Sequence, residues 1–164
     1  MAEPNLERAQ AVFDALCRTM DRLEWHYKVV KDLTLECGAK GDDLPMDLTV
    51  KVDAERCLIR LISLLPFSIP EDKRLDVVVA ISALNNALVD GCFDLDLGDG
   101  ALFFRMTNSY ADSELGPEVF EYLLYSSCQV IDEYNDRFLM LSKGMLSLEK
   151  WISMITENGG EDDE

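Results

Sequence analysis

The chain has 164 residues, 48% of them hydrophobic, and its 32 acidic residues outnumber the 15 basic ones to give a net charge of −17. This length and apolar content predict one domain with one core, at residues 1–157, followed by an acidic disordered tail at 158–164. Nucleic acids and anionic membrane surfaces are themselves negative, so the charge argues against both as partners. We expect a protein partner instead.

The five cysteines contain no C-x-x-C pair, and His26 is the only histidine, so the spacing predicts no zinc site. Free thiols within apolar runs are typical of a reducing compartment. The first residues lack a signal-peptide pattern, and no apolar run reaches membrane-spanning length. We therefore expect a cytoplasmic protein that needs no cofactor and no metal.

The first half of the chain predicts one helix and three strands. Residues 5–23 repeat apolar side chains at helical spacing, with Asn5 as the N-cap. Residues 25–37 alternate polar and apolar side chains, although Lys31 interrupts the apolar side, and residues 46–53 alternate without a break. Residues 57–65 form a third strand that is apolar on both faces. Short connections predict an antiparallel meander.

The second half predicts a helix, a pair of strands and a long final helix. Pro70 opens the first helix and Gly91 ends it. The predicted stripe of that helix consists of Leu75, Val78, Val79, Ser82, Leu84, Ala87 and Leu88. The last helix follows Pro117 and keeps a seven-residue apolar repeat to Ile155, with a candidate bend at Gly144. The predicted class is α+β, a five-stranded antiparallel sheet packed with helices in the order α-β-β-β-α-β-β-α.

Three aspartates crowd the stretch C-F-D-L-D-L-G-D-G at residues 92–100. A calcium loop of the EF-hand type that started at Asp94 would have Arg105 at its twelfth position, where a bidentate carboxylate is required. The alternation of Phe93, Leu95 and Leu97 with the acids predicts a hairpin instead. We expect Arg105 on the returning strand to pair with a carboxylate.

No enzyme signature is present. His26 has no nucleophile motif near it, and Asp42 and Asp43 have the composition of a loop rather than of a catalytic dyad. The glycines lack the spacing of a phosphate-binding loop. If a ligand pocket exists between sheet and helices, its best candidates are Trp25, His26 and Tyr27 beside a carboxylate.

The end of the last helix carries more apolar side chains than one packed face needs, since Leu146 and Trp151 lie off the main stripe. Exposed apolar groups of this kind predict an interface, with burial in the core as the equal alternative. The candidate partner or dimer surface consists of Met140, Met145, Leu148, Trp151 and Ile152.

The run A-I-S-A-L-N-N-A-L-V-D-G-C-F-D-L-D-L-G-D-G-A-L-F-F-R (80–105) resembles the YbjN family of bacterial sensory-transduction regulators. Leu84 and Asn85, the G-x-F at 91–93, the D-G turn at 99–100 and the L-G-P-E at 115–118 carry the resemblance. It implies the fold of type III secretion chaperones, which are small, acidic, cytoplasmic proteins, and it brings no catalytic residues.

The preferred hypothesis is a non-enzymatic protein-interaction module of YbjN type, a homodimer that binds its partner through a sheet face or the C-terminal helix surface. A secretion-type chaperone that holds a client segment is one alternative. A small-ligand binder or enzyme with an unrecognised pocket is the other.

Overall fold

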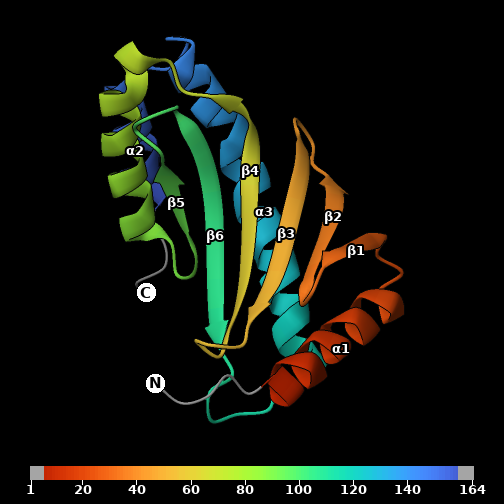
Figure 1. Cartoon of the computed structure of the whole chain (residues 1–164). Coiled ribbons are helices and arrows are strands. Elements are labelled where there is room, and N and C mark those ends of the chain that lie inside the picture. The colour runs from red at the N-terminus through yellow and green to blue at the C-terminus, as the bar shows by residue number, and fades with distance from the viewer. Residues whose placement is uncertain (1–5, 159–164) are drawn as a thin grey trace.

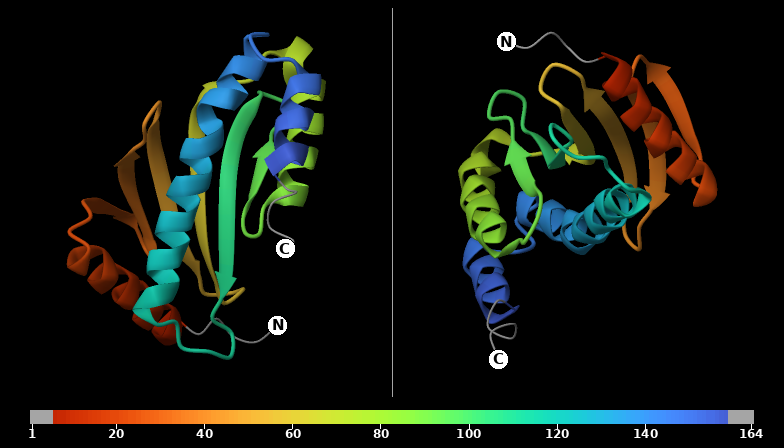
Figure 2. Two further views of the ribbon diagram at one scale, coloured as in Figure 1. Left: turned by 180° about the vertical axis from the view of Figure 1, so that it is seen from behind. Right: turned by 90° about the horizontal axis from the view of Figure 1, so that it is seen from below.

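The computed structural model describes residues 6–158, which form a curved antiparallel sheet with α3 running across one of its faces (Figures 1 and 2). The six strands lie in the order β1-β2-β3-β4-β6-β5. The elements, in chain order, are α1 (Leu6–Arg22), β1 (Tyr27–Lys31), β2 (Thr34–Lys40), β3 (Pro45–Asp53), β4 (Leu58–Ser68), the 3₁₀ turn η1 (Glu71–Lys73), α2 (Arg74–Ala87), β5 (Cys92–Leu95), β6 (Ala101–Ser109), α3 (Pro117–Ser142) and α4 (Leu148–Asn158).

The predicted α+β class and antiparallel sheet are confirmed, and the strand count of five is wrong. The stretch predicted as one strand is a hairpin, in which β1 and β2 are joined by a turn at Asp32 and Leu33, where Leu33 has a φ of 55°. Tyr27 and Val29 pair with Cys37 and Leu35, and the register shift between Val29 and Lys31 keeps these residues on one face across the turn, so the period alone does not reveal the hairpin. The break at Lys31 was the visible signal.

Strand β3 shows why the sheet has two different faces. Met46, Leu48, Val50 and Val52 are buried, and the residues between them point to the other side. Inward side chains of β4 and β6, such as Leu61 and Phe104, continue the buried layer beneath α3. One hydrophobic core therefore fills the space between this inner face and the helices.

The final helix is two helices, which corrects the prediction. Helix α3 ends at Ser142, Gly144 adopts a φ of 70°, and α4 folds back against α2 (Figure 2). Trp151 is 1% exposed; its indole N–H donates to the Ala80 carbonyl at 3.1 Å, and its ring lies 4.6 Å from that of Phe138. The seven-residue repeat persists because both helices bury one stripe in the same core.

Helix α2 is apolar on more than one side. The predicted stripe is correct at Leu84, which is buried, and wrong at Leu75, Val78 and Val79, which are exposed. The buried residues are Val77, Ala80, Ile81 and Leu84. The helix ends at Ala87, and Gly91 lies in the loop beyond it. When apolar residues surround a helix, periodicity does not tell which side faces the core.

At the two ends, helix α1 is confirmed, while its predicted cap Asn5 lies outside the described residues. Asn158 belongs to α4, so the predicted tail begins one residue too early, and 159–164 lie outside the described residues. No helix within residues 6–158 is both long and apolar enough to cross a membrane.

Candidate interaction surface

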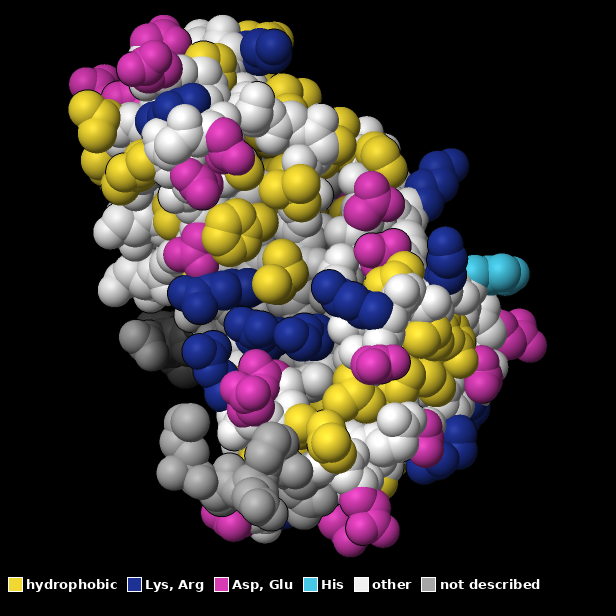
Figure 3. All heavy atoms as spheres, viewed as in Figure 1, with side chains coloured by type: hydrophobic (Ala, Val, Ile, Leu, Met, Phe, Trp, Pro, Cys, Tyr) yellow, Lys and Arg dark blue, Asp and Glu magenta, His cyan; other side chains and the backbone are white. Residues whose placement is uncertain are grey.

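The outer face of the sheet is a broad surface that the helices leave uncovered. No helix among the described residues covers this side, which is turned toward the viewer in Figure 3. We call it the open face, and its outward side chains on β3, β4 and β6 include Asp47, Thr49, Lys51, Asp53, Arg60, Ile62, Leu64, Phe103, Arg105 and Thr107.

One half of the open face is mainly apolar, although the exposed Asp47 of β3 lies opposite Leu64. Leu64 on β4 is paired with Phe103 on β6, and Leu64 keeps 57% of its surface exposed. Ile62, the outward residue before Leu64 on β4, is 37% exposed. These strands lie in the middle of the sheet, where both faces are normally covered when both are apolar. An uncovered apolar group at this position is typical of an interaction site.

The other half is basic, although the chain as a whole is strongly acidic. Lys51 on β3 lies directly opposite Arg60 on β4, and Arg105 on β6 lies opposite Ile62. Figure 3 shows a belt of Lys and Arg side chains across this part of the molecule, with hydrophobic side chains beside it. Like charges on directly opposed residues destabilise a sheet, so local packing does not account for this arrangement.

Carboxylates neutralise the belt only in part. Arg105 pairs with Asp94 through its Nε atom, as the sequence predicted for a residue on the returning strand. Arg60 lies 3.9 Å from Asp53, which also accepts backbone N–H groups of the following turn. Lys51 has no ion-pair partner among residues 6–158. The basic groups thus keep capacity to bind a further carboxylate.

The aspartate cluster is a hairpin, as predicted. Strands β5 and β6 pair antiparallel, Gly98 donates its backbone N–H to Asp96, and Ala101 donates to Asp99. Leu97 departs from the predicted alternation and is 57% exposed. Within residues 6–158, no three His, Cys, Asp or Glu side chains are grouped as metal ligands.

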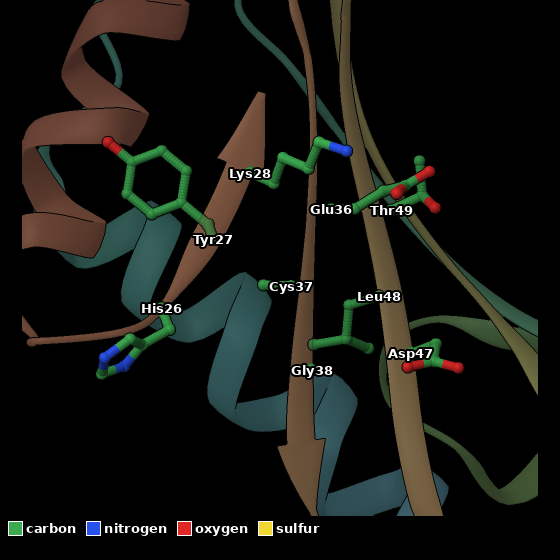
Figure 4. A pocket seen from close by; sticks show the side chains of 9 residues that line it. All are labelled: His26, Tyr27, Lys28, Glu36, Cys37, Gly38, Asp47, Leu48 and Thr49. Atoms are coloured by element: carbon green, nitrogen blue, oxygen red, sulfur yellow. The ribbon is translucent and has the colours of Figure 1, made fainter. Parts of the chain in front are cut away.

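A shallow hollow of about 610 Å³ lies where β1 and β2 meet β3. Its walls include His26, Lys28, Glu36 and Asp47 (Figure 4), and the side chains point to both sides of the strands instead of toward one centre. Tyr27 donates to Asp21 at 3.1 Å; burial, and then this hydrogen bond, raises the pKa of Tyr27 to about 12.

The predicted pocket residues therefore serve the fold. Trp25 donates its indole N–H to the Gly38 carbonyl at 3.1 Å and packs against Tyr125. His26 is exposed at the edge of the sheet. The hollow lies on the sheet rather than between sheet and helices, so Trp25, His26 and Tyr27 do not converge on a ligand there.

The five residues of the predicted C-terminal surface are divided by the structure. Met145 is 72% exposed, and Met140 and Ile152 are each 36% exposed. Leu148 is half-buried against the core, and Trp151 lies inside it. Three of the five therefore stay available as a candidate dimer surface, next to the exposed side of α2.

Burial favours the neutral form of several thiols. Burial raises the pKa of Cys37 to about 12 and that of Cys128 to about 11, with Asp132 adding to the effect at Cys128. Burial also raises the pKa of Cys92 on β5. All five cysteines are free. Thiols with raised pKa values are poor nucleophiles.

Comparison with solved structures identifies the fold as that of type III secretion chaperones. The chain is similar to YbjN from E. coli, "a putative transcription regulator", at a TM-score of 0.57 and 17% identity over 76% of this chain and 91% of that one. It is similar to a chain of the ExsC–ExsE complex at 0.53 and 16%, over 76% and 93%. A HopA1–SchA chaperone–effector complex matches at 0.46 and 22%, over 74% and 94%.

The family assignment follows from the sequence. Residues 13–140 match the YbjN family model, described as "Putative bacterial sensory transduction regulator". The chain belongs to the YbjN family. None of the curated protein sequences matches it.

Sequence reasoning missed the open face as a particular set of residues. The signal was present in residues 57–65, where both faces of the strand are apolar. The basic belt was not visible, because Lys51, Arg60 and Arg105 become neighbours only when β3, β4 and β6 pair.

Proposed function

We propose that this chain is a non-enzymatic, cytoplasmic protein-binding module, which acts as a regulator by binding a protein partner on the open face. The observation that carries the proposal is the uncovered outer face of the central strand β4, where Ile62 and Leu64 remain exposed. Burying such side chains against a partner stabilises a complex by about 25 cal/mol for each Å² removed from water.

The relatives support binding as the activity. The family description concerns signal transduction, and a structural neighbour was solved as the ExsC–ExsE complex. The likeness to that chain favours one related reading, a chaperone that holds a client segment. The hollow at His26 favours no reaction, since its polar groups do not converge.

A direct test places a photo-activatable amino acid at Leu64 and, as the control, at Leu97, because both side chains are 57% exposed. In an extract of the source cells we expect a discrete cross-linked protein from position 64 that is missing from position 97. Equal cross-linking at both positions, or none at position 64, would overturn the proposal.

The second part of the proposal is a homodimer through the outer side of α2 and α4. The hydrogen bond from Trp151 to Ala80 joins these helices, and the sequence neighbours Val79 and Ile152 of that pair are exposed. Leu75, at 77% exposure, and Met145, at 72%, extend the apolar area. A second copy presents the same apolar surface, so the two are self-complementary about a twofold axis.

Light scattering after gel filtration tests the dimer. Wild type is expected to run as a dimer, and the double variant Met145→Glu, Ile152→Glu as a folded monomer, because each carboxylate would be buried in the interface. The control is Val89→Glu, which changes an exposed valine outside both helices. A monomeric wild type, or a double variant that stays dimeric, would contradict the homodimer.

A further inference from the structure

We propose that the open face binds an acidic amphipathic helix of its partner protein. This inference rests on the proposed function and names the chemistry of the partner at the same surface. Its basis is the placement of an apolar row, Leu64 and Phe103, beside the basic belt of Lys51, Arg60 and Arg105, called the basic row below, on the open face (Figure 3).

The charge of the face selects an acidic partner. Lys51, Arg60 and Arg105 lie on neighbouring strands in a chain with a net charge of −17, and the acids beside them are Asp53 near Arg60, Asp94 on Arg105 and Asp47 opposite Leu64. Arg105 pairs with Asp94 through Nε and interacts with Cys92, and its side chain is still 52% exposed. Lys51 is exposed and has no ion-pair partner within residues 6–158. A carboxylate-bearing partner would relieve the repulsion between Lys51 and Arg60.

The spacing of the two rows fits a helix laid across the strands. Residues on adjacent strands are about 4.8 Å apart, and acidic residues three or four apart on a helix are about 5–6 Å apart. The row of Leu64 and Phe103 lies two to four residues along the strands from the basic row, about 7–14 Å away. A helix with a diameter of about 10–12 Å reaches both rows, with its apolar stripe on Leu64 and its acidic flank on Lys51.

Nucleic acid fits the face less well. Phosphates would satisfy the basic row, but they would leave Ile62 and Leu64 uncovered, and the acidic remainder of the molecule would repel the backbone. An apolar helix without acids would leave the basic row desolvated and unpaired, which is unfavourable. Only a ligand with both properties matches both rows.

The test uses three fluorescein-labelled helical peptides of about 18 residues, which is about five turns. The first has a Leu and Phe stripe with a Glu flank, the second keeps the stripe and carries Lys in the flank, and the third keeps Glu and carries Gln in the stripe. Fluorescence anisotropy with the full chain measures the three dissociation constants. We expect the first peptide to bind at least about tenfold more tightly than either of the others, and less tightly as salt is added.

The matched protein variants are two double charge reversals with the same change in net charge. Lys51→Glu with Arg105→Glu is expected to weaken binding of the first peptide about tenfold or more, and to bind the Lys peptide better than wild type does. Arg18→Glu with Lys143→Glu, which alters exposed residues on α1 and beyond α3, is expected to bind like wild type. The gained preference for the Lys peptide shows that the reversed protein is folded.

Three results would overturn the inference: equal binding of the Glu and Lys peptides, an unchanged affinity in the Lys51→Glu, Arg105→Glu variant, or tighter binding of a single-stranded RNA that displaces the first peptide. Cross-linking of a protein at position 64 without a preference for the Glu peptide would leave the proposed function standing and reject the acidic helix. Absence of that cross-link would reject the proposed function itself.

Discussion

The two faces of the sheet are built from alternate residues of the same strands, and their side chains differ in both burial and chemistry. On the inner face, Leu61 and Phe104 are completely buried beneath the helices. On the outer face, their neighbours Ile62 and Phe103 meet solvent together with Arg105. In β3 the outward positions are polar, as a solvated face requires, whereas β4 presents Ile62 and Leu64 there beside Arg60. Apolar residues on an uncovered face are therefore not part of the packing that holds the fold together.

The largest expected effect is a difference in stability between variants of two adjacent residues, Phe104 on the inner face and Phe103 on the open face. Phe104→Ala removes a fully buried ring that lies 5.1 Å from the ring of Phe93, and should lower the free energy of unfolding by about 3–5 kcal/mol. Phe103→Ala, on the open face, should lower it by about 1 kcal/mol or less. Urea denaturation measures both. Similar losses at the two positions would mean that the outer face is packed as tightly as the core.

Much of the fold was predictable, because residues 46–53 and α1 each bury one clean stripe. The errors arose where several arrangements satisfy one pattern. The register shift before the turn at Leu33 keeps the alternation intact, and two antiparallel helices can keep one repeat across Gly144. The predicted α2 stripe includes the buried Leu84 and also exposed residues, because that helix is apolar around most of its circumference.

The candidate site was less predictable than the fold for a different reason. The sequence leaves interface and core as equal alternatives for Trp151, which fills the core between α2 and α3, because no local pattern distinguishes a buried tryptophan from an interface one. The basic belt depends on pairing between β4 and β6, which are separated in the chain by α2 and β5. Long-range register is set by the whole core and is not encoded in a short stretch.

The turn between β5 and β6 allows the same comparison of buried and exposed positions at two glycines. Gly100 is buried with a φ of 79°, and an added Cβ would lie 2.2 Å from the Ile69 carbonyl oxygen. Gly100→Ala should therefore lower the free energy of unfolding by about 2–4 kcal/mol. Gly98→Ala should change it little, since its Cβ would meet only the end of the Asp96 side chain. Equal thermal stability of the two variants would contradict this account of the turn.

The stability of the protein at alkaline pH should report on the buried thiol of Cys37, which lies on the inner side of β2. Its pKa rises from 9.0 to about 12 because burial disfavours the thiolate. Below pH 9 the thiol is protonated in both the folded and the unfolded chain, and its contribution to the free energy of unfolding is fully present. Between pH 9 and 12 only the unfolded chain loses the thiol proton. Stability should fall there with a slope of about 1.4 kcal/mol per pH unit from this group.

Urea denaturation at a series of pH values under reducing conditions, with Cys37→Ala as the reference, isolates that contribution from the other titrating groups. The variant is expected to be less stable than wild type at pH 8 and to lose stability less steeply above pH 9. Parallel curves for the two proteins would show that Cys37 is more accessible to water than the structure indicates.

The smallest expected effect concerns the basic row of the open face. Lys51 lies directly opposite Arg60, so Lys51→Gln should raise the free energy of unfolding by about 0.2–1 kcal/mol at low salt, and the gain should shrink as salt screens the charges. Lys28 lies opposite Glu36, so the matched change Lys28→Gln should lower stability instead. A loss of stability in Lys51→Gln would show that this lysine supports the fold. A gain in stability, together with weaker binding of the acidic peptide, would mean that the row is unfavourable for the isolated chain and is satisfied only by its partner.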